Sequence, residues 1–445
     1  MKKFYLVHLG CSKNMIDSEM LIYDLLKCNY IKTKNPSEAE VIIINTCAFT
    51  EEADEESITA ILEAAEYKKI GSCKYLIVIG CLSQKYKEEL LNEIPEIDAI
   101  FGTGDFMKVK DIISEGIKEK YCVVGRPEYN YPKVGNRFLL TPKHTAYLKI
   151  AEGCVNCCSY CIIPKLRGSY RSRPFNIVLE EAKILVEKGV KEICLVAQDT
   201  SLYGRDLNDK TNFTKLLECI AKECDVPWLR FLYYYPTRVD KTLLNVMKKN
   251  DNICKYLDIP LQHVNADLLK KMNREGDYKT YIDLIFFIKD EIPDITLRST
   301  FIVGFPGEGQ KEFEELVDFL EKAEFDWAGF FAFSPQIGTP AYNLGPRVQR
   351  KEIEKRLAIL REMQLKISEK RNMRFLNRKI PALVEGKSDE NDETYVGRAE
   401  NQAPEIDGQV IIKGAERKHI GSFVNVYINH VYDYDLMGEV VGEYS

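Results

Sequence analysis

The stretch EGCVNCCSYC at residues 152–161 places four cysteines within eight positions, at Cys154, Cys157, Cys158 and Cys161. Cys154, Cys158 and Cys161 form a CxxxCxxC triad, and thiolates are the usual ligands of iron–sulfur clusters. Three thiolates bind three irons of a 4Fe–4S cluster and leave the fourth iron open. The alternative is a structural zinc bound by all four cysteines, but such sites usually combine two cysteine pairs from separate segments. The spacing therefore favours a reactive cluster and leaves zinc as the alternative.

Six strand-like runs lie around this stretch, one directly before it and five after it, and helical patterns alternate with them. The predicted strands are Tyr147–Ala151, Glu192–Ala197, Trp228–Tyr235, Tyr256–Leu261, Thr296–Val303 and Trp327–Phe333. The predicted helices are Ile177–Lys188, Phe213–Glu223, Thr242–Lys249, Tyr278–Asp290 and Lys311–Lys322. Six β/α units predict an α/β fold with a partial (β/α)6 barrel, in which the chemistry belongs to the loops after the strands. The four cysteines lie in the loop after the first strand.

Other strand ends of this barrel supply candidate contacts for a cofactor. The candidates are Gln198, Asp199, Gln262, Gly304 and Gly307, with His263 beside them. Glycine lets the backbone approach a ligand closely, but it serves ordinary turns equally well. A helix cap explains Asp199 as well as a ligand contact does, and His263 fits a structural hydrogen-bonding role.

The N-terminal third alternates apolar runs at Phe4–Leu9, Val41–Ile44 and Tyr75–Ile79 with helical patterns at Asp17–Lys27 and Glu51–Lys69. This alternation predicts a parallel sheet that is covered by helices on both faces.

Each of these three strands leads directly into a cysteine, at Cys11, Cys47 and Cys81. Parallel α/β sheets bind ligands beyond the carboxyl ends of their strands. If the strands are neighbours, the three thiols converge, and we expect a second three-cysteine metal site. The alternative is that cysteine serves at each strand end as a small buried residue.

After Pro381 the pattern changes to short alternating runs at Tyr395–Arg398, Gln409–Ile412 and Phe423–Ile428, which predict a small antiparallel β-barrel. A charged helix over Gln349–Phe375 leads to it. Five Lys and Arg stand against 13 Asp and Glu in this last part, a balance of −8, so the rest of the chain carries +2 of the total −6. Acidic charge repels phosphates and attracts a basic protein. A solvated acidic surface without a partner is the alternative.

The composition sets further limits. The chain has 445 residues, 45% of them hydrophobic, and no run that approaches the roughly 20 apolar residues of a membrane span. The apolar run in MKKFYLVHLGC is short and is interpreted as a first strand, so we expect a cytoplasmic protein without a membrane partner. In a reducing compartment, 14 cysteines indicate metal binding more than disulfides. The negative net charge argues against a large nucleic-acid interface.

The stretches GCSKNMIDSE, EGCVNCCSYCIIPKLRGSYRSRP, LDIPLQH and FIVGFPGE resemble the radical S-adenosylmethionine methylthiotransferases, over essentially the whole chain. Within that family they are closest to the branch that modifies ribosomal protein S twelve, whereas the tRNA branch typically reads GCQMN and LPVQSG at the first and third places. The resemblance implies an N-terminal methylthiotransferase domain (1–125), a linker (126–144), a radical barrel (145–376) and a TRAM domain (377–445).

The resemblance also implies the metal ligands and the reaction. Two 4Fe–4S clusters are implied, one on Cys154, Cys158 and Cys161 that cleaves S-adenosylmethionine, and an auxiliary one on the three strand-end cysteines; Cys157 is not part of the pattern. An electron from a donor protein would generate a 5′-deoxyadenosyl radical that abstracts hydrogen from Cβ of an aspartate. A methylthio group then joins that carbon, and two S-adenosylmethionines are used per turnover.

Two other functions compete with this one. The first is the tRNA isopentenyl-adenosine methylthiotransferase, favoured by the basic residues Lys165, Arg167, Arg171 and Arg173, although the acidic C-terminal part argues against tRNA. The second is a non-enzymatic iron–sulfur electron carrier, which would not cleave S-adenosylmethionine.

Overall fold

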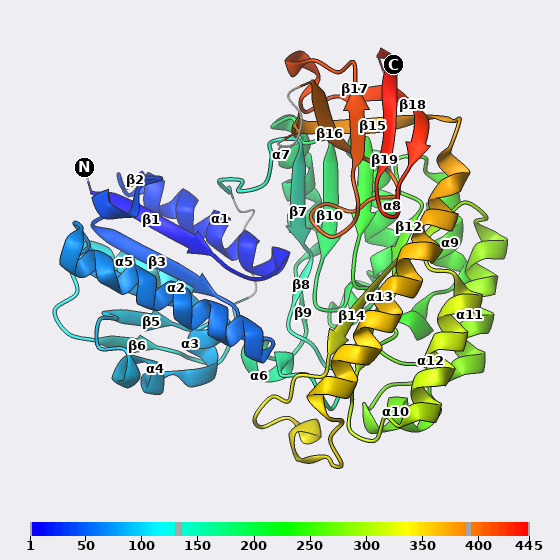
Figure 1. Cartoon of the computed structure of the whole chain (residues 1–445). Helices are drawn as coiled ribbons and strands as arrows, with labels where there is room; N and C mark the ends of the chain where they lie inside the picture. Colours follow the sequence, from blue (N-terminus) through cyan, green and yellow to red (C-terminus); the bar gives the residue numbers. More distant parts are fainter. Residues whose placement is uncertain (1, 130, 132–135, 389–392, 444–445) are drawn as a thin grey trace.

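The computed structural model describes residues 2–129, 131, 136–388 and 393–443, which form three units (Figure 1). An N-terminal α/β unit lies beside a central partial barrel, and a small β-barrel covers one end of that barrel. No helix among these residues is both long and apolar enough to cross a membrane. Part of the expected linker and the acidic residues Asp389, Glu390 and Asp392 lie outside the described residues.

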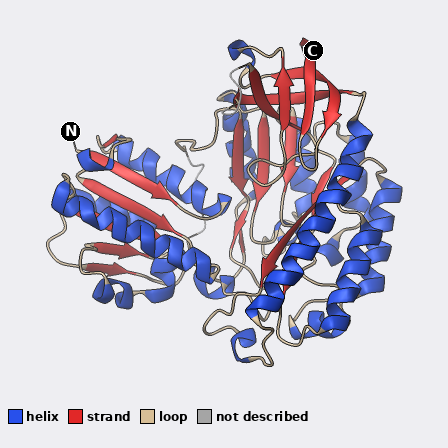
Figure 2. Ribbon diagram, viewed as in Figure 1, coloured by secondary structure: helices blue, strands red, loops and turns tan. Residues whose placement is uncertain are grey.

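The N-terminal unit is a six-stranded parallel sheet in the order β2-β1-β3-β4-β5-β6, with helices on both faces (Figure 2). Its strands are β1 (Lys3–His8), β2 (Ile31–Lys32), β3 (Val41–Thr46), β4 (Tyr75–Gly80), β5 (Ala99–Phe101) and β6 (Tyr121–Val123). Its helices are α1 (Ser12–Lys27), α2 (Glu51–Ile70), α3 (Cys81–Tyr86), α4 (Glu88–Glu93) and α5 (Val109–Glu115).

Strand β3 shows why the sheet needs both helical layers. Ile43 belongs to the apolar cluster with α1 and α5, whereas its neighbours Ile42 and Ile44 belong to the cluster with α2, α3 and α4. Successive side chains of a strand point to opposite faces, so a continuous apolar run has to be covered twice. The predicted parallel sheet is confirmed.

The six predicted strands of the barrel are all present. They are β7 (Thr145–Lys149), β10 (Glu192–Val196), β11 (Trp228–Phe231), β12 (Tyr256–Asp258), β13 (Thr296–Val303) and β14 (Trp327–Ala332). They pair in parallel as β11-β10-β7 and β12-β13-β14, and a bridge between Leu229 and Ile253 leads from one half to the other. β11 ends earlier than expected, because Tyr233 adopts a left-handed conformation with φ +61°. β12 also ends early, and Pro260 beyond it has no N–H to donate to a neighbouring strand.

Helices cover the outside of the barrel strands. They are α7 (Phe175–Glu187), α8 (Phe213–Glu223), α9 (Lys241–Lys249), α10 (Ala266–Lys271), α11 (Tyr278–Glu291), α12 (Gln310–Ala323) and α13 (Arg350–Asn372). The short helix α10 was not predicted, and neither were three short elements around the cysteines, namely the antiparallel pair β8 (Ala151–Glu152) and β9 (Arg171–Ser172) and the helix α6 (Ile163–Arg167). They are too short to show a periodicity, and they enclose the cysteine loop.

The C-terminal unit is a closed barrel in the order β15-β16-β17-β19-β18. Its strands are β15 (Lys379–Lys387), β16 (Thr394–Ala399), β17 (Val410–Lys413), β18 (Phe423–Val431) and β19 (Leu436–Glu443). The barrel is confirmed, but β17 and β19 pair in parallel where an antiparallel pair was expected. β15 and β19 were missed because Pro381, Gly386 and Gly438 interrupt their alternation, and register shifts are present in their pairing with β16 and β18.

A buried ion triad and both tryptophans of the chain join the two barrels. Glu192, at the start of β10, accepts hydrogen bonds from Arg230 and from Arg398 of β16, and all three side chains are buried. Trp228 packs edge-on against Phe423, with ring centroids 4.7 Å apart. These contacts lie at the amino ends of the barrel strands. The C-terminal unit therefore covers the end of the barrel opposite the cysteine loop (Figure 1).

Candidate iron–sulfur and S-adenosylmethionine site

The cysteine loop after β8 is held from two sides. Cys154 N–H donates to Gly168 O (3.1 Å), and Ser159 N–H donates to Met272 O (2.9 Å). Gly153 begins the loop with φ +78°, and a Cβ there would lie 2.2 Å from Ser169 O. Only glycine fits this position, because the backbone is left-handed and the segment Gly168–Ser169 between α6 and β9 leaves no space.

The thiols of the predicted triad differ from that of Cys157. Cys154, Cys158 and Cys161 are half-buried, whereas Cys157 is exposed and lies at a left-handed position with φ +50°. Burial raises the pKa of Cys154 to about 11 and that of Cys161 to about 12, and the neighbouring thiol of Cys158 adds to both shifts. The three thiols are therefore electrostatic neighbours, and the thiol of Cys157 also contributes to the raised pKa of Cys154.

A buried arginine approaches this triad. Arg274 Nη1 lies 3.7 Å from Cys158 Sγ, and Arg274 Nη2 donates to Pro260 O (2.6 Å). The sequence analysis missed Arg274, which follows α10 more than 100 residues after the cysteines. A guanidinium beside a sulfur partly compensates the charge of a thiolate.

The three strand-end cysteines also come together. β1, β3 and β4 are adjacent strands, so Cys11, Cys47 and Cys81 follow neighbouring carboxyl ends. A Cβ on Gly10 would lie 3.1 Å from Cys47 Sγ, which shows how closely the first two segments approach.

The pKa values of these thiols reflect their shared environment. Burial raises the pKa of Cys47 to about 12, and the thiols of Cys81 and Cys11 contribute to that rise. Burial also acts on Cys11, but the nearby charges of Lys13 and Arg167 outweigh it and lower the pKa of this thiol. The predicted convergence of three thiols at one sheet edge is therefore present.

Within the described part of the chain, no three His, Cys, Asp or Glu side chains are arranged to hold a single metal ion. The chemistry of the donors nevertheless fits iron–sulfur clusters. Each group consists of three thiols, and thiolates are the ligands that iron–sulfur clusters and zinc select. Each group also has an arginine within hydrogen-bonding distance of one sulfur, at Cys158 and at Cys81.

Gln198 and Asp199, at the end of β10, have different surroundings. Gln198 Nε2 donates to Glu152 Oε1 (2.5 Å), while Gln198 Oε1 is buried and has no hydrogen-bond partner among the described residues. Asp199 caps the turn at Thr200–Leu202, and its Oδ2 accepts from Asn156 and Arg238 (both 2.6 Å). The side-chain oxygen of Gln198 is thus available to accept a hydrogen bond from a ligand, whereas the carboxylate of Asp199 is hydrogen-bonded within the protein.

The glycines after β13 are explained by local packing. Gly304 and Gly307 have φ +81° and +94°, and a Cβ on Gly304 would collide with Ile353 of α13 at 2.4 Å. The Gly304 N–H donates to Glu308 Oε2 (2.7 Å), and Glu308 in turn pairs with Arg356. This turn therefore joins the barrel mouth to α13.

Gln262 and His263, after β12, serve the backbone. Gln262 has φ +73°, and its main chain bridges to β13 through Thr300 and Ile302. His263 is fully buried, and its Nδ1 accepts the N–H groups of Val264 and Asn265. His263 thus has the structural role that the sequence favoured.

A buried polar network behind the cysteine loop was missed by the sequence analysis. Lys149 Nζ donates to Asp17 of α1 (2.6 Å) and to Glu152 (2.8 Å), and Tyr131 bonds both carboxylates. A lysine within the apolar run of β7 was the available signal, because an unpaired charge is very costly to bury. The network ties the N-terminal unit to the barrel.

Comparison with known proteins agrees with this architecture. Residues 3–102 match the uncharacterized protein family UPF0004, residues 148–320 match the radical SAM superfamily, and residues 378–441 match the TRAM domain. Among solved structures, the radical S-adenosylmethionine methyltransferase TsrM from Kitasatospora setae has a TM-score of 0.59 at 15% identity, over 77% of each chain, which shows a shared fold. The fold and the cysteine loop thus define a radical SAM protein.

Full-length relatives specify the family. The ribosomal protein uS12 methylthiotransferase RimO of Geobacter sulfurreducens is 43% identical over 99% of both chains. The protein of the same name from Clostridioides difficile is 44% identical over the full length of both. The chain belongs to this family of radical SAM methylthiotransferases.

Proposed function

We propose that this protein transfers a methylthio group to Cβ of an aspartate in ribosomal protein uS12, using two S-adenosylmethionines per turnover. The observation that carries the proposal is the presence of both three-thiol groups in a chain that matches uS12 methylthiotransferases over its full length. An ordinary acid or base cannot remove hydrogen from an unactivated carbon, so the reaction requires radical chemistry.

The chain offers a role for each site residue. Cys154, Cys158 and Cys161 would hold the cluster that, when bound, supplies the electron for cleavage of S-adenosylmethionine. The free, buried Oε1 of Gln198 at the barrel mouth suits a hydrogen-bond donor of that cofactor. Gly304, Gly307 and Asp199 would act through the shape of the barrel opening, since their polar groups bond within the protein, and the backbone of Gln262 is bonded to β13.

Cys11, Cys47 and Cys81 would hold the second cluster. They lie at the edge of the N-terminal sheet that faces the barrel, where the buried polar network joins the two units. This position supports transfer of the methylthio group from the second cluster to a substrate radical formed at the first site. The exposed Cys157 stands outside both groups.

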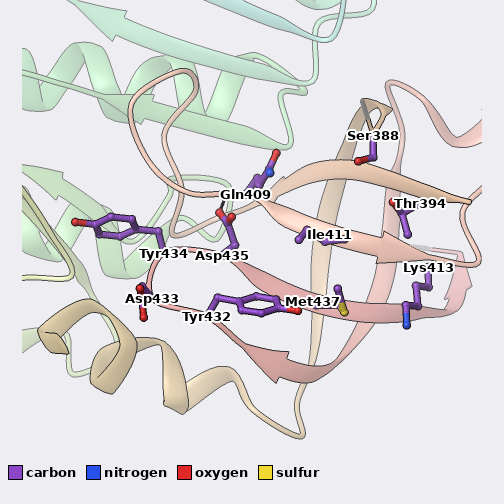
Figure 3. Close-up of a pocket in the computed structure, with 10 residues that line it drawn as sticks. All are labelled: Ser388, Thr394, Gln409, Ile411, Lys413, Tyr432, Asp433, Tyr434, Asp435 and Met437. Carbon is purple, nitrogen blue, oxygen red and sulfur yellow. Dashed lines mark hydrogen bonds between the residues drawn. The ribbon is translucent and has the colours of Figure 1, made fainter. Parts of the chain in front are cut away.

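The acidic C-terminal barrel supports a basic protein as the partner. A surface pocket of about 760 Å³ on this barrel is lined by Asp433 and Asp435 together with Tyr432, Tyr434 and Met437, and Lys413 is the one cation among the lining residues that the structure describes (Figure 3). Carboxylates and aromatic rings suit lysine and arginine side chains, and the same carboxylates repel RNA phosphates.

The basic stretch after the cysteine loop offers little to tRNA, the alternative substrate. Arg167 and Arg173 are each only 2% exposed and pair with carboxylates inside the protein. Lys165 and Arg171 are the members of this stretch that reach solvent. The observation weakens the case for a tRNA isopentenyl-adenosine substrate.

The test is anaerobic incubation of the reconstituted protein with S-adenosylmethionine, dithionite, purified uS12 and tRNA. We expect uS12 to gain the mass of one methylthio group, and a gain on tRNA alone would refute the proposal. Two clusters predict about eight irons per chain. Cys154→Ala should abolish release of 5′-deoxyadenosine, whereas the matched variant Cys157→Ala should retain it. An electron carrier would bind iron but release no deoxyadenosine.

A further inference from the structure

Arg167 is a barrel residue that reaches a thiol of the N-terminal unit. It is the last residue of α6, directly after the cysteine loop, and only 2% of it is exposed. Its Nη2 lies 3.6 Å from Cys81 Sγ and also donates to Asn14 Oδ1. Arg167 therefore follows the first three-thiol group in the chain and contacts a thiol of the second group.

Both units fix the orientation of this guanidinium. Arg167 Nη1 donates to Asp17 Oδ2 (2.8 Å) of α1 and to Glu152 Oε2 (3.3 Å) of β8. The carbonyl of the preceding Leu166 accepts from Thr103 Oγ1 of the N-terminal unit (2.5 Å). With its backbone and one nitrogen held in this way, the second nitrogen can only point toward Cys81 and Asn14.

The charges around Arg167 are balanced without the thiol. Asp17 and Glu152 carry two negative charges, and Lys149 and Arg167 carry two positive charges. The ion pairs account for the burial of Arg167, because a buried cation needs a partner. They are made by Nη1 and use no thiol, so the contact of Nη2 with Cys81 is an additional interaction of the same guanidinium.

The first three-thiol group shows the same arrangement independently. Arg274 Nη1 lies 3.7 Å from Cys158 Sγ, and Arg274 likewise comes from the barrel. Hydrogen bonds to ligand sulfurs raise the reduction potential of an iron–sulfur cluster, and groups that orient the ligands contribute to metal affinity.

We propose that Arg167 is a positioning residue for the second cluster, and that its guanidinium donates a hydrogen bond to the Cys81 thiolate, which strengthens cluster binding and raises the reduction potential. The inference rests on the proposed function, since it requires a cluster on Cys11, Cys47 and Cys81. Loss of a group that orients a metal ligand typically costs 10- to 100-fold in metal affinity.

The test isolates the second cluster in the full-length protein by replacing all three cysteines of the first group with alanine. In this background, Arg167→Gln removes the charged donor, and Arg167→Lys retains a charge for Asp17 and Glu152. Arg171→Gln is the matched control, because it removes a positive charge at the start of β9, where Arg171 contacts the carbonyls of Ser169 and Arg167 but no thiol. Asp17→Asn removes a charge from the ion network but keeps an oxygen that can accept the hydrogen bond from Arg167 Nη1.

Two measurements do not depend on activity: the rate of iron loss to a chelator, and a redox titration followed by electron paramagnetic resonance. We expect Arg167→Gln to hold the cluster about 10- to 100-fold more weakly and at a more negative potential. Arg167→Lys should show a smaller shift in the same direction, and it remains informative if the glutamine variant does not fold. Arg171→Gln should match the background.

Three results would overturn the inference. Iron binding and a potential in Arg167→Gln equal to those of the background would show that the sulfur contact is without effect. An equal shift of potential in Asp17→Asn would assign the effect to the ion network. A background protein that binds no iron would refute the second cluster itself, and with it the proposed function, which distinguishes that failure from the first two.

Discussion

Replacing Glu192 by glutamine should separate the C-terminal barrel from the central barrel at lower denaturant concentration. Burial raises the pKa of the Glu192 carboxyl, but Arg398 and Arg230 outweigh it and lower this pKa from 4.5 to about 2. At 1.36 kcal/mol per pH unit, the difference corresponds to about 3 kcal/mol of stability. Removing one partner of a buried ion pair typically costs about 3–5 kcal/mol, and because Arg398 keeps its pair with Glu385 (2.8 Å) we expect the lower end of this range.

Tryptophan fluorescence can report on the contact between the two barrels. It has two tryptophans; Trp228 packs on Phe423, and Trp327 donates its Nε1–H to Asn401 O (2.8 Å), so both report on the C-terminal barrel. Urea titrations followed by tryptophan fluorescence at pH 7 should show Glu192→Gln losing about 3 kcal/mol. In the wild type, the stabilisation is present above about pH 4.5 and is lost as the pH falls toward about 2, since the carboxyl becomes protonated.

An exposed ion pair provides the control. Glu362 and Lys366 pair on the outer face of α13, with 71% and 74% of their side chains exposed, and Glu362→Gln should leave the urea midpoint essentially unchanged. If Glu192→Gln shifts the urea midpoint no more than Glu362→Gln does, the triad does not hold the barrels together and this reasoning is wrong.

Two further perturbations test the cysteine loop and a buried histidine. Gly153→Ala places a Cβ 2.2 Å from Ser169 O, so we expect loss of about four of the eight irons expected after reconstitution. Gly189→Ala, also at a left-handed position but with nothing within 4 Å, should cost about 1–2 kcal/mol and retain all the iron. Burial, aided by Arg356, lowers the pKa of His263 from 6.5 to about 3, so stability should fall by about 1.4 kcal/mol per pH unit as the pH drops below 6.5. His263→Asn keeps an acceptor for the two N–H groups and should reduce the acid slope, measured by urea titrations at pH 7 and pH 5, to the part that the partly buried His8 contributes; an unchanged slope would contradict the assignment.

The amino-acid sequence alone determined the parts of this protein that depend on short-range pattern. The alternation of apolar runs and helices predicted both parallel sheets, because each strand and helix has to bury its own apolar face. The CxxxCxxC spacing is local, and Cys11, Cys47 and Cys81 could be placed together because parallel strands end at the same sheet edge. The C-terminal barrel was predicted less fully, since Pro381 and the glycines of β15 and β19 interrupt the alternation on which strand prediction depends.

Only the tertiary structure decided which side chains serve these sites. Arg167 and Cys81 are 86 residues apart, and Arg274 and Cys158 are 116 apart, so no local pattern links either pair. The folded chain brings Arg167 to Cys81 because the buried charges of Asp17 and Glu152 pair with it across the two units, and it brings Arg274 to Cys158 because the segment after α10 packs on the cysteine loop within the barrel. In the folded chain, Asp199 and His263 form hydrogen bonds within the protein, and the buried side-chain oxygen of Gln198 remains available to a ligand. These outcomes depend on three-dimensional proximity and desolvation, which residue spacing does not encode.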